Sequence, residues 1–340
     1  PLLLLTNRRE KDSAWLGRVR VLHGPPRLPP AASAKNAREG RMLGTYLDRP
    51  LLAPAFGATE FRDPVTGRSL SDWQTFYQSG ARLAQYVRHA GYNATMLAVT
   101  HDGGSLYPSR RLLPTPRYDN GVFFGTAQDP LQKDVLELLF RIYDREGLRL
   151  VPLIHFSAPL PELEALRRSS GATVLAGAGQ GTELKLLHEP GSGGTIGIDL
   201  VDAKGDAWRD SPEGTRGIGS LYNPVDPRVQ QAMQRVVMEV VERYGRHPSF
   251  AGLGIQLGPD AFTQFPDALW GCDATTLKRF AVEEGIVSSA AESVDSARLT
   301  ALIQGDLAER WLQWRAARLA TSYRELGHAI RSQAPQARLY

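Results

Sequence analysis

Short apolar runs, each preceded by a segment with helical spacing, constrain the fold of this chain more than any other feature. Two of them are Tyr92–Thr100 and Leu148–Phe156, and a third lies within His247–Asp260. Runs of this length that are apolar at nearly every position are typical of strands buried on both faces of a parallel sheet. Strands of this kind that alternate with helices predict an α/β fold.

Helical spacing of apolar residues marks the segments between and after these runs. The predicted helices are Ser71–Val87, Asp129–Ile142, Pro161–Arg168, Pro227–Val241, Thr275–Glu284 and Leu299–Ser332. Several begin at an Asp–Pro pair or another capping residue and end near a glycine, as helices commonly do.

Two arrangements of parallel strands fit this alternation, the doubly wound sheet and the (β/α)8 barrel. A doubly wound sheet that binds a dinucleotide carries G-x-G-x-x-G directly after a strand. No such motif follows a predicted strand here, and the glycines of Gly177–Gly181 lie in a loop-rich region with no helix after them. We therefore predict a (β/α)8-type TIM barrel. Because Ala337–Tyr340 begins a strand at the end of the chain, we expect the barrel to be incomplete at its C-terminus.

The first 40 residues read differently from the rest. Gly17–His23 alternates like a strand, and Pro25–Pro30 is dense in proline, which suggests remnant β strands of a preceding domain followed by a stiff linker. Residues 41–340 then form the barrel, with a glycine-rich loop insertion at 169–220 that we expect to lie over the barrel mouth. Within it, Thr195–Asp202 and the turn Lys204–Asp206 predict a hairpin.

Composition narrows the class of protein. With 42% hydrophobic and 22% charged residues the chain is an ordinary folded protein. The net charge of +4 is spread along the chain, so we expect no nucleic-acid partner. Pro1–Leu5 is too short an apolar run to span a membrane. Cys272 is the single cysteine, which rules out an internal disulfide and a Cys-based zinc site.

Asp260 is the candidate catalytic residue. It follows the predicted strand of His247–Asp260, and the carboxyl ends of barrel strands form the open face where such enzymes keep their chemistry. A general acid needs a raised pKa, which Phe262, Phe265 and Trp270 could provide by desolvating the carboxylate. The alternative is a loop aspartate that caps the next turn.

Other polar and aromatic residues are expected at the same face. His101 and Asp102 follow Tyr92–Thr100, and His155 ends the next strand. The full set of candidate substrate-binding residues is His101, Asp102, Tyr107, Arg110, His155, Gln256, Trp208 and Trp270. The structural alternatives are a glycine turn at Asp102 and a core position for His155. The spacing of His101, Asp102 and His155 matches no metal motif, so we predict no metal and no cofactor.

Two segments resemble known families. His247–Asp260 resembles the strand of clan A glycoside hydrolases, in particular the family 42 β-galactosidases, and places Asp260 at the general-acid position. Gly258 and Pro259 stand where that pattern has Asp and Asn. Leu221–Val229 is similar to the motif that caps the helix before a central strand in the glycoside hydrolase-like family 10 proteins.

The resemblance implies a TIM barrel with a carbohydrate substrate in a bacterial, extracytoplasmic protein, and a second catalytic carboxylate after Tyr340. Glycoside hydrolysis by two carboxylates needs both groups. The first hypothesis is therefore a glycoside hydrolase. The alternatives are a non-catalytic glycan-binding barrel and a structural or surface-assembly module that uses Gly171–Gly219 as its contact.

Overall fold

The computed structural model describes most of the chain beyond residue 40. The described residues are 41–56, 72–101, 103–112, 133–169, 174–176, 185–187, 197–212, 214–217, 219–287 and 295–340. The predicted preceding domain, residues 1–40, lies outside them, as do Asp102 and the larger part of the 169–196 segment.

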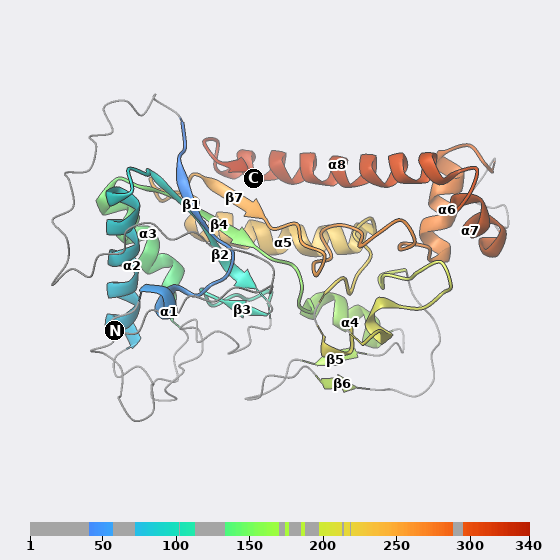
Figure 1. Cartoon of the computed structure of the whole chain (residues 1–340), viewed down its shortest axis with the longest axis horizontal. Coiled ribbons are helices and arrows are strands. Elements are labelled where there is room, and N and C mark those ends of the chain that lie inside the picture. The colour runs from blue at the N-terminus through green and yellow to red at the C-terminus, as the bar shows by residue number, and fades with distance from the viewer. Residues whose placement is uncertain are drawn as a thin grey trace, which may run out of the picture.

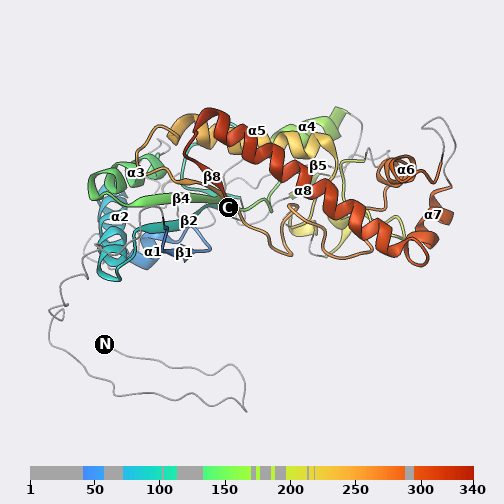
Figure 2. The same ribbon diagram turned by 90° about the horizontal axis from the view of Figure 1, so that it is seen from above.

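Five parallel strands form the central sheet in the order in which they occur along the chain (Figures 1 and 2). They are β1 (Gly44–Leu47), β2 (Ala94–His101), β4 (Arg149–Ile154), β7 (Gly252–Ile255) and β8 (Arg338–Leu339). The short strand β3 (Gly104–Ser105) folds back on β2, and β5 (Val174–Ala176) pairs with β6 (Lys185–Leu187) in a separate ribbon.

Sequential strand order distinguishes two ways of winding the sheet. In a doubly wound sheet the order reverses at a switch point, whereas in a barrel wall every crossover steps the same way. Here every crossover between β1 and β8 steps to the next position. The predicted parallel α/β architecture is thus confirmed. The sheet is open, because among the described residues neither β1 nor β8 pairs with a further strand at its outer edge.

Helices connect these strands and cover one face of the sheet. The main ones are α2 (Asp72–His89), α3 (Val135–Glu146), α5 (Pro227–Tyr244) and α8 (Ala308–Gln333). Shorter helices are α1 (Leu52–Phe56), α4 (Pro161–Ser169), α6 (Ala274–Glu283) and α7 (Ser296–Ile303), with 3₁₀ turns η3 (Trp208–Asp210) and η4 (Gly214–Arg216). Figure 2 shows α5 and α8 running from the sheet toward the end of the molecule where α6 and α7 lie.

The hydrophobic core lies between the sheet and these helices. Leu97, Val99, Leu150 and Leu253 turn toward it and pack with the apolar positions of α2, α3, α5 and α8. The other face of the sheet carries a small separate cluster, made of Ala98, Val151 and Leu153 with Met42, Met96 and Ala251 at its margin. The sheet is therefore apolar on both faces, as its continuous apolar strands predicted.

Capping residues fix where the helices begin. Asp134 accepts a hydrogen bond from the amide of Glu137, and Asp226 accepts one from Arg228, with Pro227 in the first turn of α5. These are the partners that the free amides at a helix start require. The predicted helix Leu299–Ser332 is in fact two helices, because the chain turns at Gln304–Leu307, where the amide of Leu307 bonds the carbonyl of Leu302.

A second, smaller core lies at the end of the molecule formed by α6, α7 and the first half of α8. Trp311 and Trp314 are buried there and stack with their ring centres 5.4 Å apart. Their spacing of three residues places both side chains on one face of α8. Within the described residues, no helix is long and apolar enough to cross a bilayer.

Buried charges hold the insertion to α4. Arg209 donates to Glu164 (2.9 Å) and to Asp199 (3.2 Å), and Arg167 donates to Asp199 (2.8 Å). Tyr222 adds a 2.5 Å hydrogen bond to Glu164. All five residues are at most 3% exposed. Because Asp199 and Arg209 belong to the insertion and Glu164 and Arg167 to α4, the network holds the described part of the insertion against α4.

Removing one member of this network leaves buried charge without its partner. We expect Arg209→Met to lower the free energy of unfolding by about 3–5 kcal/mol, measured by urea denaturation. Arg310→Met is the matched control, since Arg310 pairs with Glu284 at the surface and such pairs contribute about 0–1 kcal/mol. Equal losses for the two variants would contradict this account.

His247 links α3 to the start of β7. Its Nδ1 lies 2.7 Å from Asp144 Oδ2 and its Nε2 lies 3.0 Å from Glu137 Oε2. Burial opposes protonation, but the hydrogen bonds to Asp144 and Glu137 outweigh it and raise the pKa of His247. A raised pKa in the folded state adds stability that is present below the ordinary pKa and is lost as pH rises through the folded value.

We expect His247→Gln to cost about 1 kcal/mol of folding free energy near pH 5.5, from the loss of charge-assisted hydrogen bonds, and clearly less near pH 8.5. Urea denaturation at both pH values measures the difference. His89→Gln, at an exposed position of α2, is the control and should show no such dependence. A loss of folding free energy for His247→Gln that is larger near pH 8.5 than near pH 5.5 would contradict this account.

Candidate functional site

An irregularity in β2 brings His101 to the concave face of the sheet. Ala98 pairs with Leu153, but Thr100, not Val99, pairs with Ile154. One extra residue in a strand reverses the side to which the following side chains point. His101 therefore lies opposite His155, and the two imidazole rings stack with centres 4.2 Å apart and an interplanar angle of 16°. Both residues are buried.

The next strand continues this row. Ile154 pairs with Ile255, and the amide of Gln256 donates to the carbonyl of Ile154. Gln256 therefore follows β7 at the level where His155 follows β4. The carboxyl ends of β2, β4 and β7 thus present His101, His155 and Gln256 side by side.

Contacts across the face show how strongly the sheet curves. The side-chain amide of Gln256 donates to the hydroxyl of Tyr46 (2.9 Å) and to the carbonyl of Asp48 (3.0 Å). Tyr46 belongs to β1 and Asp48 follows it, so two strands separate them from β7. In a flat sheet three strand spacings measure about 14 Å, which a glutamine side chain does not span. The sheet therefore curves around these side chains.

Asp260 lies at the edge of this row. Its Oδ1 is 3.3 Å from Nε2 of His155, whose side chain is 4% exposed, whereas that of Asp260 is 56% exposed. The hydroxyl of Ser220 donates to the carbonyls of Pro259 (3.3 Å) and Ala261 (3.2 Å) and so supports the loop from the insertion. The site thus offers an accessible carboxylate against a buried imidazole.

The aromatic pocket expected around Asp260 is not formed. Phe262 is fully buried and packs against Phe156 and Tyr222. Phe265 lies under Arg315, with 4.4 Å between the guanidinium carbon and the ring centre. The rings of Phe262 and Phe265 therefore pack in the interior beside the loop, and they do not cover the exposed Asp260 carboxylate.

Tyr107 and Arg110 are not brought to this group. Tyr107 is fully buried against Tyr244, and burial raises the pKa of its hydroxyl. The amide of Arg110 donates to Glu239 of α5 (2.7 Å), and its exposed side chain lines a polar groove of about 930 Å³ beside that helix. The loop turns back over the helical layer after β3, which carries both residues away. Asp102 lies outside the described residues.

Trp208 and Trp270 meet each other. Their ring centres are 5.3 Å apart in an edge-to-face arrangement. Gly219, at φ +112°, lets the backbone approach Trp208, since a Cβ there would lie 2.9 Å from the indole nitrogen. Arg315, whose pKa burial lowers to about 10, donates to the carbonyl of Trp270 (2.8 Å). The two residues thus form one fixed pair instead of two separate stacking surfaces.

Three residues of the site escaped the sequence-based search. Tyr46 and Asp48 lie at the carboxyl end of β1, and Ser220 comes from the insertion. Asp48 had the same signal as His101, a polar residue directly after an apolar strand segment. Ser220 had none, since only the fold brings it to the Asp260 loop. In the part of the chain that the structure describes, no group of three or more His, Cys, Asp or Glu could hold a metal ion.

No family model and no curated protein matches this sequence. Among solved structures the chain is similar to a β-galactosidase from the psychrophilic Marinomonas ef1, with 12% identity and a TM-score of 0.44 over 88% of this chain and 36% of that chain. It is also similar to a β-galactosidase from the Antarctic haloarchaeon Halorubrum lacusprofundi, with 14% identity and a TM-score of 0.41 over 78% of this chain and 34% of that chain. For an α-L-fucosidase GH29 from Bacteroides thetaiotaomicron the identity is 13% and the TM-score is 0.28, over 65% of this chain and 40% of that chain.

These neighbours are glycoside hydrolases. The chain spans about a third of the length of the two β-galactosidases. With identities below 25% and TM-scores below 0.5, the likenesses assign neither a family nor an activity to the chain.

Gly258 controls the position of the Asp260 carboxylate. A Cβ at Gly258 would lie 2.6 Å from Asp260 Oδ1 and 3.4 Å from His155 Nε2. We expect Gly258→Ala to turn the carboxylate away from His155 while changing the folding free energy by less than about 1 kcal/mol, because only the end of an exposed side chain moves. A crystal structure of the variant and its urea denaturation check both points. A carboxylate that keeps its 3.3 Å contact with His155 would refute the expectation.

Proposed function

We propose that the concave face binds carbohydrate and that the chain is part of a glycoside hydrolase in which Asp260 donates the proton. The observation that carries the proposal is the Asp260–His155 pair at the carboxyl ends of consecutive parallel strands. This is the end of a parallel sheet at which the loops that follow the strands build active sites.

The chemistry of the pair fits proton transfer to a leaving group. In its acid form the accessible Asp260 carboxyl can deliver a proton to a glycosidic oxygen. His155 lies on the buried side, so it fixes the direction from which the carboxyl approaches. Hydrolysis then requires a second carboxylate across the bond.

Polar groups beside the pair suit a substrate rich in hydroxyls. Gln256 uses its amide nitrogen on Tyr46 and Asp48, while its oxygen is buried with no hydrogen-bond partner among the described residues. A buried acceptor without a donor costs free energy until a ligand supplies one. Because this oxygen is enclosed, a sugar hydroxyl would reach it only after the neighbouring side chains move.

The closed barrel belongs to the same proposal. Sequential strand order and strong curvature support a barrel wall, and further strands would close it between β8 and β1. We expect the second catalytic carboxylate at the end of one of them, after Tyr340. A location outside the cytoplasm, where most polysaccharide substrates occur, is part of this proposal as well.

A non-catalytic glycan-binding barrel is the second candidate. Two observations favour it: the Asp260 side chain is 56% exposed, and Gly258 and Pro259 replace the Asp and Asn of the motif that it resembles. The surroundings of Asp260 therefore lack the desolvating pocket that a general acid commonly has.

Aryl glycosides with different leaving groups distinguish the two candidates. In the full-length protein we expect Asp260→Asn to lower kcat about 10²–10⁴-fold for poor leaving groups and far less for dinitrophenyl glycosides, which leave without protonation. Asp306→Asn, in the exposed turn before α8, is the control. Unchanged turnover by the Asp260→Asn variant would contradict the catalytic role of Asp260. Glycan binding without any turnover by the unaltered protein would support the second candidate.

A further inference from the structure

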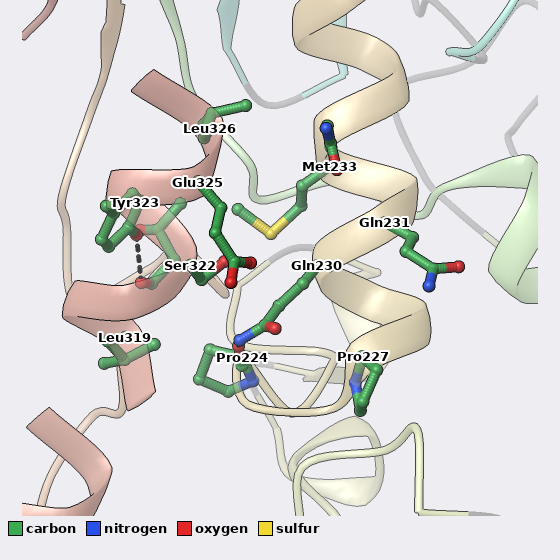
Figure 3. A pocket seen from close by; sticks show the side chains of 12 residues that line it. Pro224, Pro227, Gln230, Gln231, Met233, Leu319, Ser322, Tyr323, Glu325 and Leu326 are labelled. Atoms are coloured by element: carbon green, nitrogen blue, oxygen red, sulfur yellow. Dashed lines mark hydrogen bonds between the residues drawn. The ribbon is translucent and has the colours of Figure 1, made fainter. Parts of the chain in front are cut away.

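A pocket of about 230 Å³ lies between α5 and α8, separate from the row of residues at the strand ends. In Figure 3, Met233 and Gln230 of α5 point into it from one side and Glu325 of α8 from the other, whereas Gln231 points away. The volume equals that of about eight water molecules at liquid density. It has room for a small organic molecule.

The walls of the pocket are fixed before any ligand arrives. Met233 and Leu326 form an apolar floor and are each 7% exposed. Tyr323 is held by a 2.5 Å hydrogen bond from its hydroxyl to the carbonyl of Thr263. Gln230 is held by a 2.9 Å hydrogen bond to the carbonyl of Pro224. Groups that are already ordered lose little conformational entropy on binding.

The charge of the lining selects one kind of ligand. Of the twelve residues that line the pocket, Glu325 is the only acidic or basic one, and the others are apolar, amide or hydroxyl residues. An anion would find no counter-charge in this lining. A cation would find the Glu325 carboxylate, amide oxygens, the ring of Tyr323 and the polarisable sulfur of Met233.

We propose that this pocket binds a small organic cation, with an ammonium group beside Glu325 and an apolar body against Met233 and Leu326. The inference is independent of carbohydrate chemistry at the strand ends. A neutral alcohol of the same shape would fill the floor equally well but would gain nothing from the carboxylate.

Methionine methyl groups allow a direct test. The sequence has four methionines, Met42, Met96, Met233 and Met238, so ¹³C-methyl-labelled protein gives few signals, which single Met→Leu variants assign. We expect 2-phenylethylammonium to shift the Met233 signal in a saturable way, with a Kd on the order of a millimolar. 2-Phenylethanol should bind at least about fivefold more weakly.

Two variants on α8 isolate the role of the carboxylate. Glu325→Gln should remove the preference for the ammonium over the alcohol, and Glu309→Gln, at an exposed position of the same helix, should keep it. Equal binding of the two ligands, or no shift of Met233, would overturn the proposal. A response confined to Met42 and Met96 would also overturn it, because these residues border the concave face.

Discussion

Hydrogen bonding between β2, β4 and β7 is the constraint on which the rest of the structure depends. Their registers place His101, His155 and Gln256 at one level, and the bulge in β2 turns His101 to the same side as His155. Side chains on neighbouring strands can then meet without help from the loops. The curvature that lets Gln256 reach Tyr46 closes this row into a concave surface.

The loops beyond the strands are held by buried polar contacts. Arg209 and Asp199 bind the insertion to α4, and Asn223 donates to Asp273 (2.8 Å) and Thr276 (2.7 Å) of the next helical segment. The attraction between buried ions offsets the cost of their desolvation only when every ion is paired. Such a network is therefore stable in one arrangement of its side chains. This rigidity positions Ser220 under the Asp260 loop, although the two are 40 residues apart in sequence.

The two proposed binding surfaces differ in chemistry. The concave face has an imidazole–carboxylate pair and an unsatisfied amide oxygen, which suits proton transfer and hydroxyl groups. The pocket between α5 and α8 has one carboxylate over an apolar floor. Tyr323 and Thr263 link the pocket to the concave face. The hydroxyl of Tyr323 donates to the backbone carbonyl of Thr263, and the hydroxyl of Thr263 donates to the backbone carbonyl of Gln256.

The sequence by itself determined what depends on neighbours along the chain. Apolar periodicity placed most helices and strands within a few residues, and Asp226 with Pro227 was sufficient to start α5. The predicted start of α3 at Asp129 was wrong, because the helix begins after Asp134, whose side chain accepts the hydrogen bond from Glu137. The parallel class of the sheet followed from strands that are apolar on both faces. Only the tertiary structure decided that Tyr107 is buried, that Trp208 pairs with Trp270 and that Asp260 is exposed. Those outcomes depend on a bulge, a returning loop and contacts between distant segments, which local periodicity does not encode.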